Sequence, residues 1–340
     1  MGEITFEARF LGIPEDEVVR ITTVLKSYLN VVVGAGLNLD SLEALVVADD
    51  YAEGFRSVPD AHGAPGRDNH TNEEFARGVA MAIPVRRPEG WRSTVVLAKS
   101  LARTMISEDD SVRRLGSATF VHELAHVADH GEKARMWGPF EASFPLNGAE
   151  FYLWGWADRL WSEYRACRVA SFIDPEGVVA HAELMAERLK PSQEALIDCL
   201  KEYRVSGDLD GLLAAVERHH GFVLKQAAYT IGGLESIGKS LEETSPSSAA
   251  ALKGSWFEKT YHVLGSELRR LAESYPSWTH PSDMQGLLDA LRASFAEVGI
   301  VHRSVRGADG RATHKADVPF TDGTLPSPEE EAAIRSRLGI

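Results

Sequence analysis

The stretch Ala118-Thr-Phe-Val-His-Glu-Leu-Ala-His-Val-Ala128 places two histidines four residues apart in an apolar, helix-favouring sequence. Residues four apart lie on the same face of a helix, so the imidazoles of His122 and His126 can bind one zinc ion. Glu123 follows the first histidine and can reach a water molecule on the same metal. The stretch therefore predicts a metal-binding helix with a carboxylate beside the metal.

Capping signals on both sides of this stretch support a helix. Asp109, Asp110 and Ser111 offer capping groups at its start, and Gly131 offers a stop. A second interpretation stays open, in which the two histidines fall one turn apart on a buried helix by coincidence. That helix would need partners for two imidazoles and a carboxylate, because buried polar groups cost free energy unless they are hydrogen-bonded. We therefore favour the metal site.

Catalytic zinc has three protein ligands and an open position for water, so a third ligand must join the two histidines. His130 continues the four-residue spacing, but a helix advances about 6 Å every four residues, and three stacked histidines cannot all reach one ion. A metzincin would have glycine at position 129 and a ligand at position 132, where this chain has Asp129 and Glu132. Asp129 lacks the freedom of glycine to turn the chain sharply. The third ligand is therefore expected beyond this helix.

Glu163 is the predicted third ligand, on a second helix-like run over 149–172. It belongs to a stripe of residues at helical spacing, formed by Trp156, Leu160, Glu163, Cys167 and Ala170. A carboxylate on an apolar stripe that faces another helix is costly unless it meets a cation, and a zinc ion on the two histidines would be such a cation. The alternative is a glutamate at the edge of the stripe, paired with Arg159 or Arg168.

The His-Glu-x-x-His motif followed by a glutamate on the next helix resembles the gluzincin type of zincin metallopeptidase. The sequence after Glu163 is similar to that of the ImmA/IrrE-like metallopeptidases, in which small residues, aliphatic residues and a proline follow the ligand glutamate. The matching residues are Ala166, Ala170, Ile173 and Pro175. Cys167 stands where this group has asparagine and where thermolysin-like gluzincins have aspartate, and Val169 stands where the group has phenylalanine. The resemblance covers about residues 80–175.

The resemblance implies a zinc-dependent hydrolase of peptide bonds that acts on a peptide or protein. One zinc ion per chain would be held by His122, His126 and Glu163, and would lower the pKa of its bound water to about 7. Glu123 would take the proton from that water and deliver it to the leaving amine.

Other residues are candidates for supporting roles in this site. A tetrahedral intermediate needs a donor for its oxyanion, and the candidates are Tyr152, Tyr164, Arg168 and His181. Asp129 is a candidate to orient a ligand imidazole, or alternatively a solvated residue near the helix end.

Composition narrows the class of protein. The chain has 340 residues and a formal net charge of −14, which disfavours nucleic acid and anionic membranes as partners. Two cysteines, Cys167 and Cys199, predict neither a disulfide framework nor a cysteine-rich structural zinc site. The absence of a leader pattern and of a run of about 18 apolar residues predicts a cytoplasmic protein without a membrane segment. The substrate and the oligomeric state do not follow from the sequence.

The pattern along the chain predicts an α+β fold, with a zincin-like small sheet, metal-binding helices and a mainly α-helical C-terminal region. The expected units are a metallopeptidase domain over 1–176, a helical domain over 177–300 and a loose tail over 301–340 with a short terminal helix. The N-terminal elements expected are strands at 4–10, 42–48, 78–85 and 93–97, a helix at 14–30 and a loop at 57–72. The later helices expected are at 178–204, 208–219, 222–242, 247–275, 282–299 and 329–338.

The sequence also predicts where the aromatic residues over 151–161 and the remaining histidines lie in the fold. The aromatic cluster over 151–161 is expected to pack in the core rather than to line a substrate site, because aromatic side chains bury large areas. The remaining histidines are expected on the surface or in loops, and they are His62, His70, His219, His220, His262, His280, His302 and His314.

Two other classes of function remain beside the hydrolase. One is a pseudo-peptidase, a zincin-shaped module that binds a partner without cutting it. The other is a regulatory protein whose helical half carries the function. The presence of Glu123 favours the enzyme, because a module that only binds needs no general base.

Overall fold

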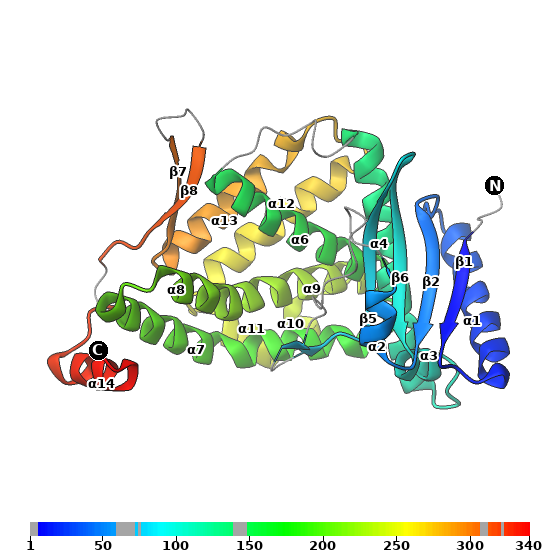
Figure 1. Ribbon diagram of the computed structural model, residues 1–340, viewed down its shortest axis with the longest axis horizontal. Helices are drawn as coiled ribbons and strands as arrows, with labels where there is room; N and C mark the ends of the chain where they lie inside the picture. Colours follow the sequence, from blue (N-terminus) through cyan, green and yellow to red (C-terminus); the bar gives the residue numbers. More distant parts are fainter. Residues whose placement is uncertain (1–5, 59–71, 74–75, 139–147, 307–311, 321–322) are drawn as a thin grey trace.

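The computed structural model describes residues 6–58, 72–73, 76–138, 148–306, 312–320 and 323–340. A small sheet lies at one end of the molecule and a body of helices at the other (Figure 1). The predicted α+β class, with a mainly helical C-terminal part, is confirmed. Most of the predicted loop at 57–72 lies outside the described residues, as do His62 and His70.

The sheet has four strands in the order β1-β2-β6-β5. The strands β1 (Glu7–Leu11), β2 (Leu42–Ala48) and β6 (Gly90–Ala98) run parallel, and β5 (Ala80–Arg87) pairs antiparallel with β6. β2 and the second half of β6 are buried apolar runs, as expected of strands covered on both faces. β5 is the edge strand that faces the helical body (Figure 1). A separate short pair is formed by β3 (Asn72–Glu73) and β4 (Ala76–Arg77).

Four helices accompany the sheet: α1 (Glu15–Gly34), α2 (Tyr51–Arg56), α3 (Lys99–Met105) and α4 (Asp110–Trp137). α1, α3 and α4 pack with the strands around one hydrophobic core. The two short helices α2 and α3 escaped prediction, because six or seven residues carry too little periodic signal.

α4 contains His122, Glu123 and His126 and is longer than predicted. Asp109 caps its start, as expected, by accepting hydrogen bonds from the amides of Ser111 and Val112. The predicted stop at Gly131 is wrong, because the helix continues to Trp137 and ends at Gly138. Gly131 instead allows a close approach, since a Cβ atom there would lie 2.8 Å from Oγ of Ser41.

The helical body begins with α6 (Ala149–Ala170) and α7 (Pro175–Ser206). It continues with α8 (Leu209–Val216), α9 (Phe222–Ile237), α10 (Leu241–Thr244), α11 (Pro246–Leu252), α12 (Glu258–Ser274) and α13 (Gln285–Glu297). A π-helical turn, Glu217–Gly221, joins α8 to α9, so the predicted break at Gly221 is wrong. A Cβ atom at Gly221 would clash with the ring of Trp156, which explains the glycine. The predicted helix over 247–275 is divided into α11 and α12.

The C-terminal segment differs from its prediction as a loose tail. A β-hairpin of β7 (Val301–Arg306) and β8 (Ala312–Asp317) occupies part of it, and the predicted terminal helix is present as α14 (Pro328–Leu338). His302 is buried and packs with His314 against Tyr152. His220 is also buried, so the prediction of a surface position is wrong for both His220 and His302.

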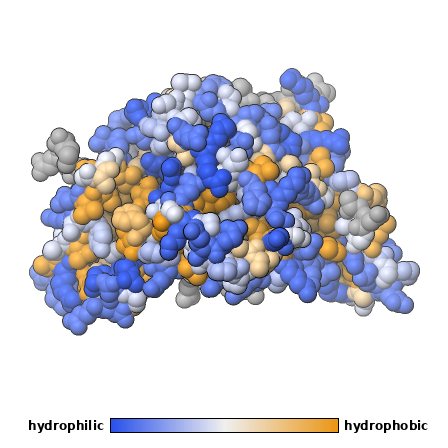
Figure 2. All heavy atoms as spheres, turned by 180° about the vertical axis from the view of Figure 1, so that it is seen from behind, coloured by the Kyte–Doolittle hydropathy of each residue, from blue (hydrophilic) through white to orange (hydrophobic). Residues whose placement is uncertain are grey.

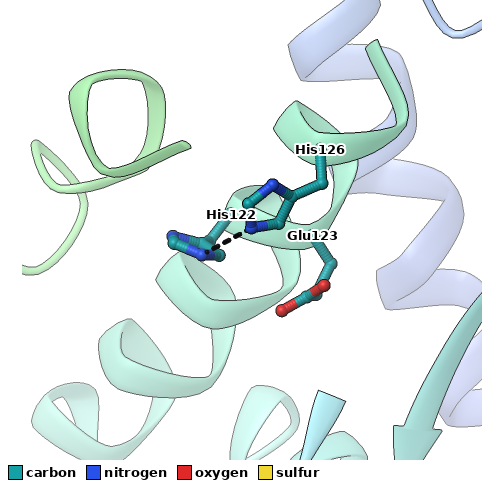
Figure 3. A group of neighbouring side chains, drawn as sticks. All are labelled: His122, Glu123 and His126. Atoms are coloured by element: carbon teal, nitrogen blue, oxygen red, sulfur yellow. Dashed lines mark hydrogen bonds between the residues drawn. The ribbon is translucent and has the colours of Figure 1, made fainter. Parts of the chain in front are cut away.

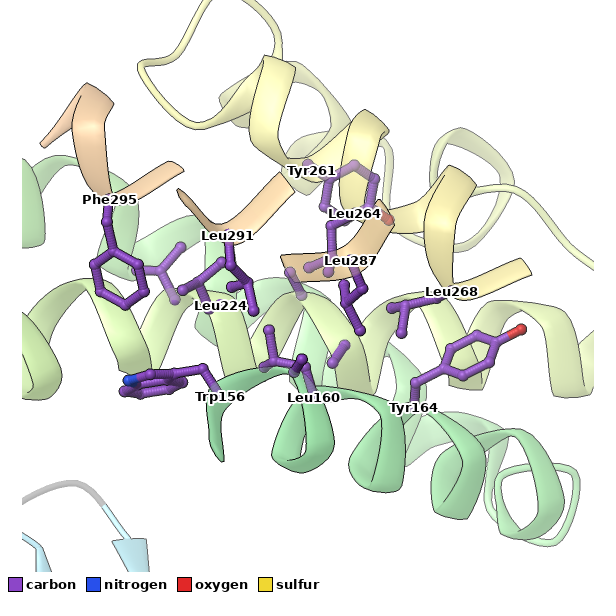
Figure 4. Close-up of a cluster of buried hydrophobic side chains, with 14 of the residues drawn as sticks. Trp156, Leu160, Tyr164, Leu224, Tyr261, Leu264, Leu268, Leu287, Leu291 and Phe295 are labelled. Carbon is purple, nitrogen blue, oxygen red and sulfur yellow. The ribbon is translucent and has the colours of Figure 1, made fainter. Parts of the chain in front are cut away.

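α6 contributes to both of the larger hydrophobic clusters among the described residues. Its tryptophans Trp154, Trp156 and Trp161 are buried, as predicted for core packing, whereas Phe151 is 60% exposed, so the prediction is wrong for that residue. Trp156, Leu160 and Tyr164 point from one face of α6 towards α9, α12 and α13 (Figure 4). Ala170, near the end of the same helix, belongs to the core under the sheet. α6 is therefore shared between the sheet region and the helical body.

The face of the molecule shown in Figure 2 is mainly hydrophilic. Hydrophilic residues cover most of the face seen in Figure 2, and hydrophobic residues gather there in separate patches. Within the described ranges, no helix is both long enough and apolar enough to cross a bilayer.

Candidate metal centre

Two imidazoles of α4 converge on one point. His122 and His126 lie one turn apart, and their rings turn towards each other beside the carboxylate of Glu123 (Figure 3). The two Nε2 atoms are 3.0 Å apart. Two lone pairs at that distance repel unless a proton or a cation lies between them. The helix therefore presents a pair of donors that suits a cation.

Glu163 from α6 completes a set of three ligand atoms. Its Oε2 lies 3.2 Å from Nε2 of His122 and 3.3 Å from Nε2 of His126. Ligand atoms bound tetrahedrally at about 2.0 Å from a zinc ion lie about 3.3 Å from one another. The three atoms have this spacing, so the residues present fit a small divalent cation such as zinc.

The other nitrogen of each imidazole contacts α6. Nδ1 of His126 lies 2.8 Å from Oγ of Ser162, and Nδ1 of His122 lies 3.7 Å from Sγ of Cys167. A group that accepts the Nδ1 proton leaves the lone pair on Nε2, which is the form that binds a metal. Cys167 thus contacts a ligand imidazole from the position where thermolysin-like gluzincins carry aspartate. Ser162 was missed because a serine next to Glu163 gives no signal in the sequence.

The charges of the three groups depend on one another. Burial lowers the pKa of His122, but hydrogen bonds with Cys167 and Glu163 outweigh it and hold the pKa well above its usual range. Burial raises the pKa of Glu163, whereas the two imidazoles lower it, and the lowering prevails. The site therefore favours a negative carboxylate facing a positive charge on its histidine side.

Glu123 is held beside the ligand atoms by the edge of the sheet. Its side chain is buried, with 8% of the residue exposed, and its Oε2 accepts a hydrogen bond of 2.7 Å from the amide of Ala82 in β5. Ligand atoms of His122, Glu123 and His126 all lie within 4.8 Å of one another. Glu123 therefore lies beside the two imidazoles with one carboxylate oxygen fixed by the sheet.

A cleft of about 610 Å³ opens in front of these groups. One wall is the chain around β5, including Gly78, Ala80, Met81 and Ala82. The opposite wall comes from α6 and α9 and includes Asp158, Arg159, Ser162, Lys225 and Tyr229. A second cavity of about 340 Å³ lies on the other side of His122 and Glu123 and includes His181 and Tyr229.

Tyr229 is a functional candidate that sequence reasoning missed. Its ring centre lies 6.0 Å from that of His122, and its side chain lines the same cavity as Glu163. Burial raises the pKa of Tyr229 well above its usual range, and Glu163 raises it further, so the hydroxyl keeps its proton. Tyr229 lies on α9, far from the motif in sequence, and only tertiary packing brings it to the site.

Three predicted oxyanion donors lie elsewhere. Tyr164 donates a hydrogen bond of 2.5 Å to Glu235, and Arg168 forms an ion pair with the same carboxylate. Tyr152 packs on the hairpin. None of these three residues lines either cavity beside the histidines, so the structure does not bring them to the candidate site. His181 does line a cavity of the site, where it contacts Gln226 and the ring of Tyr229.

Asp129 performs neither of its two predicted roles. It is fully buried, accepts a hydrogen bond from Nε1 of Trp161, and lies 2.7 Å from Nζ of Lys133. It is therefore neither solvated nor a partner of a ligand imidazole. The positive charges of Lys133 and Arg165 overcome the effect of burial and hold the pKa of Asp129 well below its usual range.

The residues at helical spacing on α6, which were predicted to form one stripe, face two different parts of the structure. Trp156 and Leu160 belong to the core of the helical body, whereas Glu163 and Cys167 face the histidines of α4. The alternative partners of Glu163 are engaged elsewhere, since Arg159 pairs with Glu217 and Arg168 with Glu235.

Comparison of the chain with protein-family models, with curated proteins and with solved structures gives no match. The assignment of a function therefore rests on the arrangement of these side chains.

Proposed function

We propose that this protein is a zinc-dependent peptidase with one zinc ion per chain. The observation that carries the proposal is the triangle formed by Nε2 of His122, Nε2 of His126 and Oε2 of Glu163, with edges of 3.0–3.3 Å. Three protein ligands that face a cleft leave a position for water, which is the arrangement of catalytic rather than structural zinc. The spacing of the three atoms supports zinc as the bound cation.

Each residue of the site has a role in this proposal. Bound zinc would acidify a water molecule and polarise the substrate carbonyl. Glu123 takes the proton from the water and passes it to the leaving amine. Tyr229, whose hydroxyl stays protonated, donates a hydrogen bond to the oxygen of the tetrahedral intermediate.

The edge strand β5 offers a place for an extended peptide. The amide of Ala98 in β6 donates to the carbonyl of Val79, so alternate residues from 79 onwards pair with β6. Ala80 and Ala82 therefore direct their backbone groups to the free edge, as the bond from Ala82 to Glu123 illustrates. A substrate strand can add to this edge beside the catalytic groups.

We also propose that the protein acts in the cytoplasm. Cys167 and Cys199 are free thiols, which suits a reducing environment such as the cytoplasm.

Metal analysis tests the site without a substrate. Purified wild-type protein should contain about one zinc per chain by mass spectrometry, and His122→Ala combined with His126→Ala should contain none. Glu163→Gln should bind zinc more weakly, whereas Glu150→Gln, an exposed position on the same helix, should not change the zinc content. Full zinc occupancy in the double histidine variant would disprove the site.

Cleavage tests the reaction. A peptide mixture of defined composition is incubated with wild-type protein and with Glu123→Gln, and the new termini are identified by mass spectrometry. Cleavage by wild type alone, with equal zinc in both proteins, supports the peptidase. Zinc binding by both proteins with no cleavage by either would instead support the pseudo-peptidase.

A further inference from the structure

α9 presents two polar side chains to the cleft. Lys225 and Tyr229 are four residues apart, so they lie on the same face of the helix, and both line the cavity in front of the metal ligands. Tyr229 also lies beside His122, with the two ring centres 6.0 Å apart. One helical turn, about 6 Å along the axis, separates Lys225 from it.

Two other charged residues on the cleft wall formed by α6 and α9, Asp158 and Arg159, already have partners. Asp158 forms an ion pair with Lys133. Arg159 lies 3.4 Å from Glu217 and stacks over the ring of Trp156. Within the described ranges, no hydrogen bond or ion pair engages Lys225, although the chain carries 50 acidic residues and 36 basic ones. Lys225 is half-buried, and since no carboxylate of the described residues forms an ion pair with it, its ammonium group is positioned to receive a carboxylate from outside.

We infer that Lys225 selects peptides that carry a carboxylate close to the scissile bond. This inference rests on the proposed function and specifies its substrate class. An extended peptide advances about 3.4 Å per residue, so one helical turn corresponds to one or two residues from the bond that is cut. The carboxylate has two possible sources, an aspartate or glutamate side chain or the free C-terminus of the peptide. The first makes the enzyme an acid-selective endopeptidase, and the second makes it a carboxypeptidase.

Hydroxamate probes measure this recognition without catalysis. One pair is N-acetyl-glutamyl hydroxamate and its glutaminyl counterpart, and the other is a succinyl hydroxamate with a free carboxylate and the same compound with an amide. The hydroxamate end binds the metal, so each pair differs only in the carboxylate. Binding is measured by calorimetry with zinc-loaded wild type, Lys225→Met and Lys225→Glu. Lys190→Met, at an exposed lysine on α7, is the matched control.

We expect wild type and Lys190→Met to bind the carboxylate member of at least one pair about tenfold more tightly than its neutral counterpart. The pair that shows the preference identifies the source of the carboxylate. Lys225→Met should bind both members equally, and Lys225→Glu should prefer the neutral one, with zinc content unchanged in both.

Other outcomes would contradict the inference in distinguishable ways. Equal binding of both members of each pair by zinc-loaded wild type would overturn the role of Lys225 and leave the proposed peptidase intact. A preference that persists in Lys225→Met but disappears in Arg159→Met would assign the recognition to Arg159 and overturn the inference as well. Failure of wild type to bind zinc and hydroxamate would overturn the proposed function and this inference together.

Discussion

The amide of Ala82 donates a hydrogen bond of 2.7 Å to Oε2 of Glu123, so the free edge of the sheet holds the carboxylate proposed as the general base. Ala82→Pro removes this donor without removing a bond between β5 and β6, because the amide of Ala82 points to the free edge. We expect peptidase activity to fall about 100-fold, with zinc content unchanged. Ala82→Gly keeps the amide and is the control. Equal activity losses in both variants would contradict a role for the hydrogen bond.

Tyr229→Phe tests the proposed donor to the tetrahedral intermediate. Removing one such donor lowers kcat by a factor of about 100 to 1,000. We expect a loss in this range, with little change in KM or zinc content, and Tyr261→Phe in the helical core should behave as wild type. A change in KM alone would place Tyr229 in substrate binding instead.

Ser162→Ala tests the orientation of His126. The hydroxyl lies 2.8 Å from Nδ1 of His126, and loss of such a contact lowers metal affinity by a factor of about 10 to 100. Competition for zinc with a chelator should show this decrease, and Ser162→Thr, which keeps a hydroxyl, should restore the affinity. Unchanged zinc affinity in Ser162→Ala would show that the imidazole is held by other contacts.

Asp129 and Asp158 offer a matched comparison for stability, because both pair with Lys133. Asp129 is fully buried, whereas the side chain of Asp158 is 42% exposed. Removing the buried partner should lower the free energy of unfolding by about 3 kcal/mol in Asp129→Asn. Asp158→Asn should cost less than about 1 kcal/mol. Urea unfolding of the zinc-free proteins measures both, and equal losses would contradict this assignment.

The buried side chain of His220 should make the free energy of unfolding decrease at acid pH. Burial lowers its pKa to about 3, where it bonds to Ser294. The unfolded chain, with a histidine pKa near 6.5, binds more protons than the folded one between these values, so stability falls as the pH falls through this window. From pH 7 to 4.5 this histidine should cost about 2–3 kcal/mol. Urea unfolding of His220→Gln should show a smaller decrease over this range, whereas the exposed variant His262→Gln should decline as wild type does.

Local spacing accounts for the parts of the site that the sequence predicts. His122, Glu123 and His126 lie within two turns of one helix, so their arrangement follows from helical geometry. The prediction of Glu163 depended on a stripe of apolar residues that faces two neighbours in the structure. In the structure the carboxylate of Glu163 faces the imidazoles of His122 and His126 instead of an arginine.

Contacts between distant segments account for what the sequence does not predict. Tyr229 and Lys225 reach the cleft because α9 packs against α6, and no local pattern marks them. Glycine is typical of helix ends, but Gly131 and Gly221 lie inside helical segments. There the missing side chain allows close contact with Ser41 and Trp156. Glycine can mark either a helix end or a close contact between segments. Only the tertiary neighbour of each glycine distinguishes the two.

The sharing of α6 between two cores has a consequence for the newly made chain. Phe295, which packs in the core on one face of α6, follows Glu163 by 132 residues. At about 5–20 residues per second, a ribosome needs on the order of ten seconds to add that length. Only then can α6 make all of its contacts in the helical body. Under the function proposed above, the two histidines and Glu123 are therefore synthesised well before the helix that carries Glu163 has its full set of packing partners.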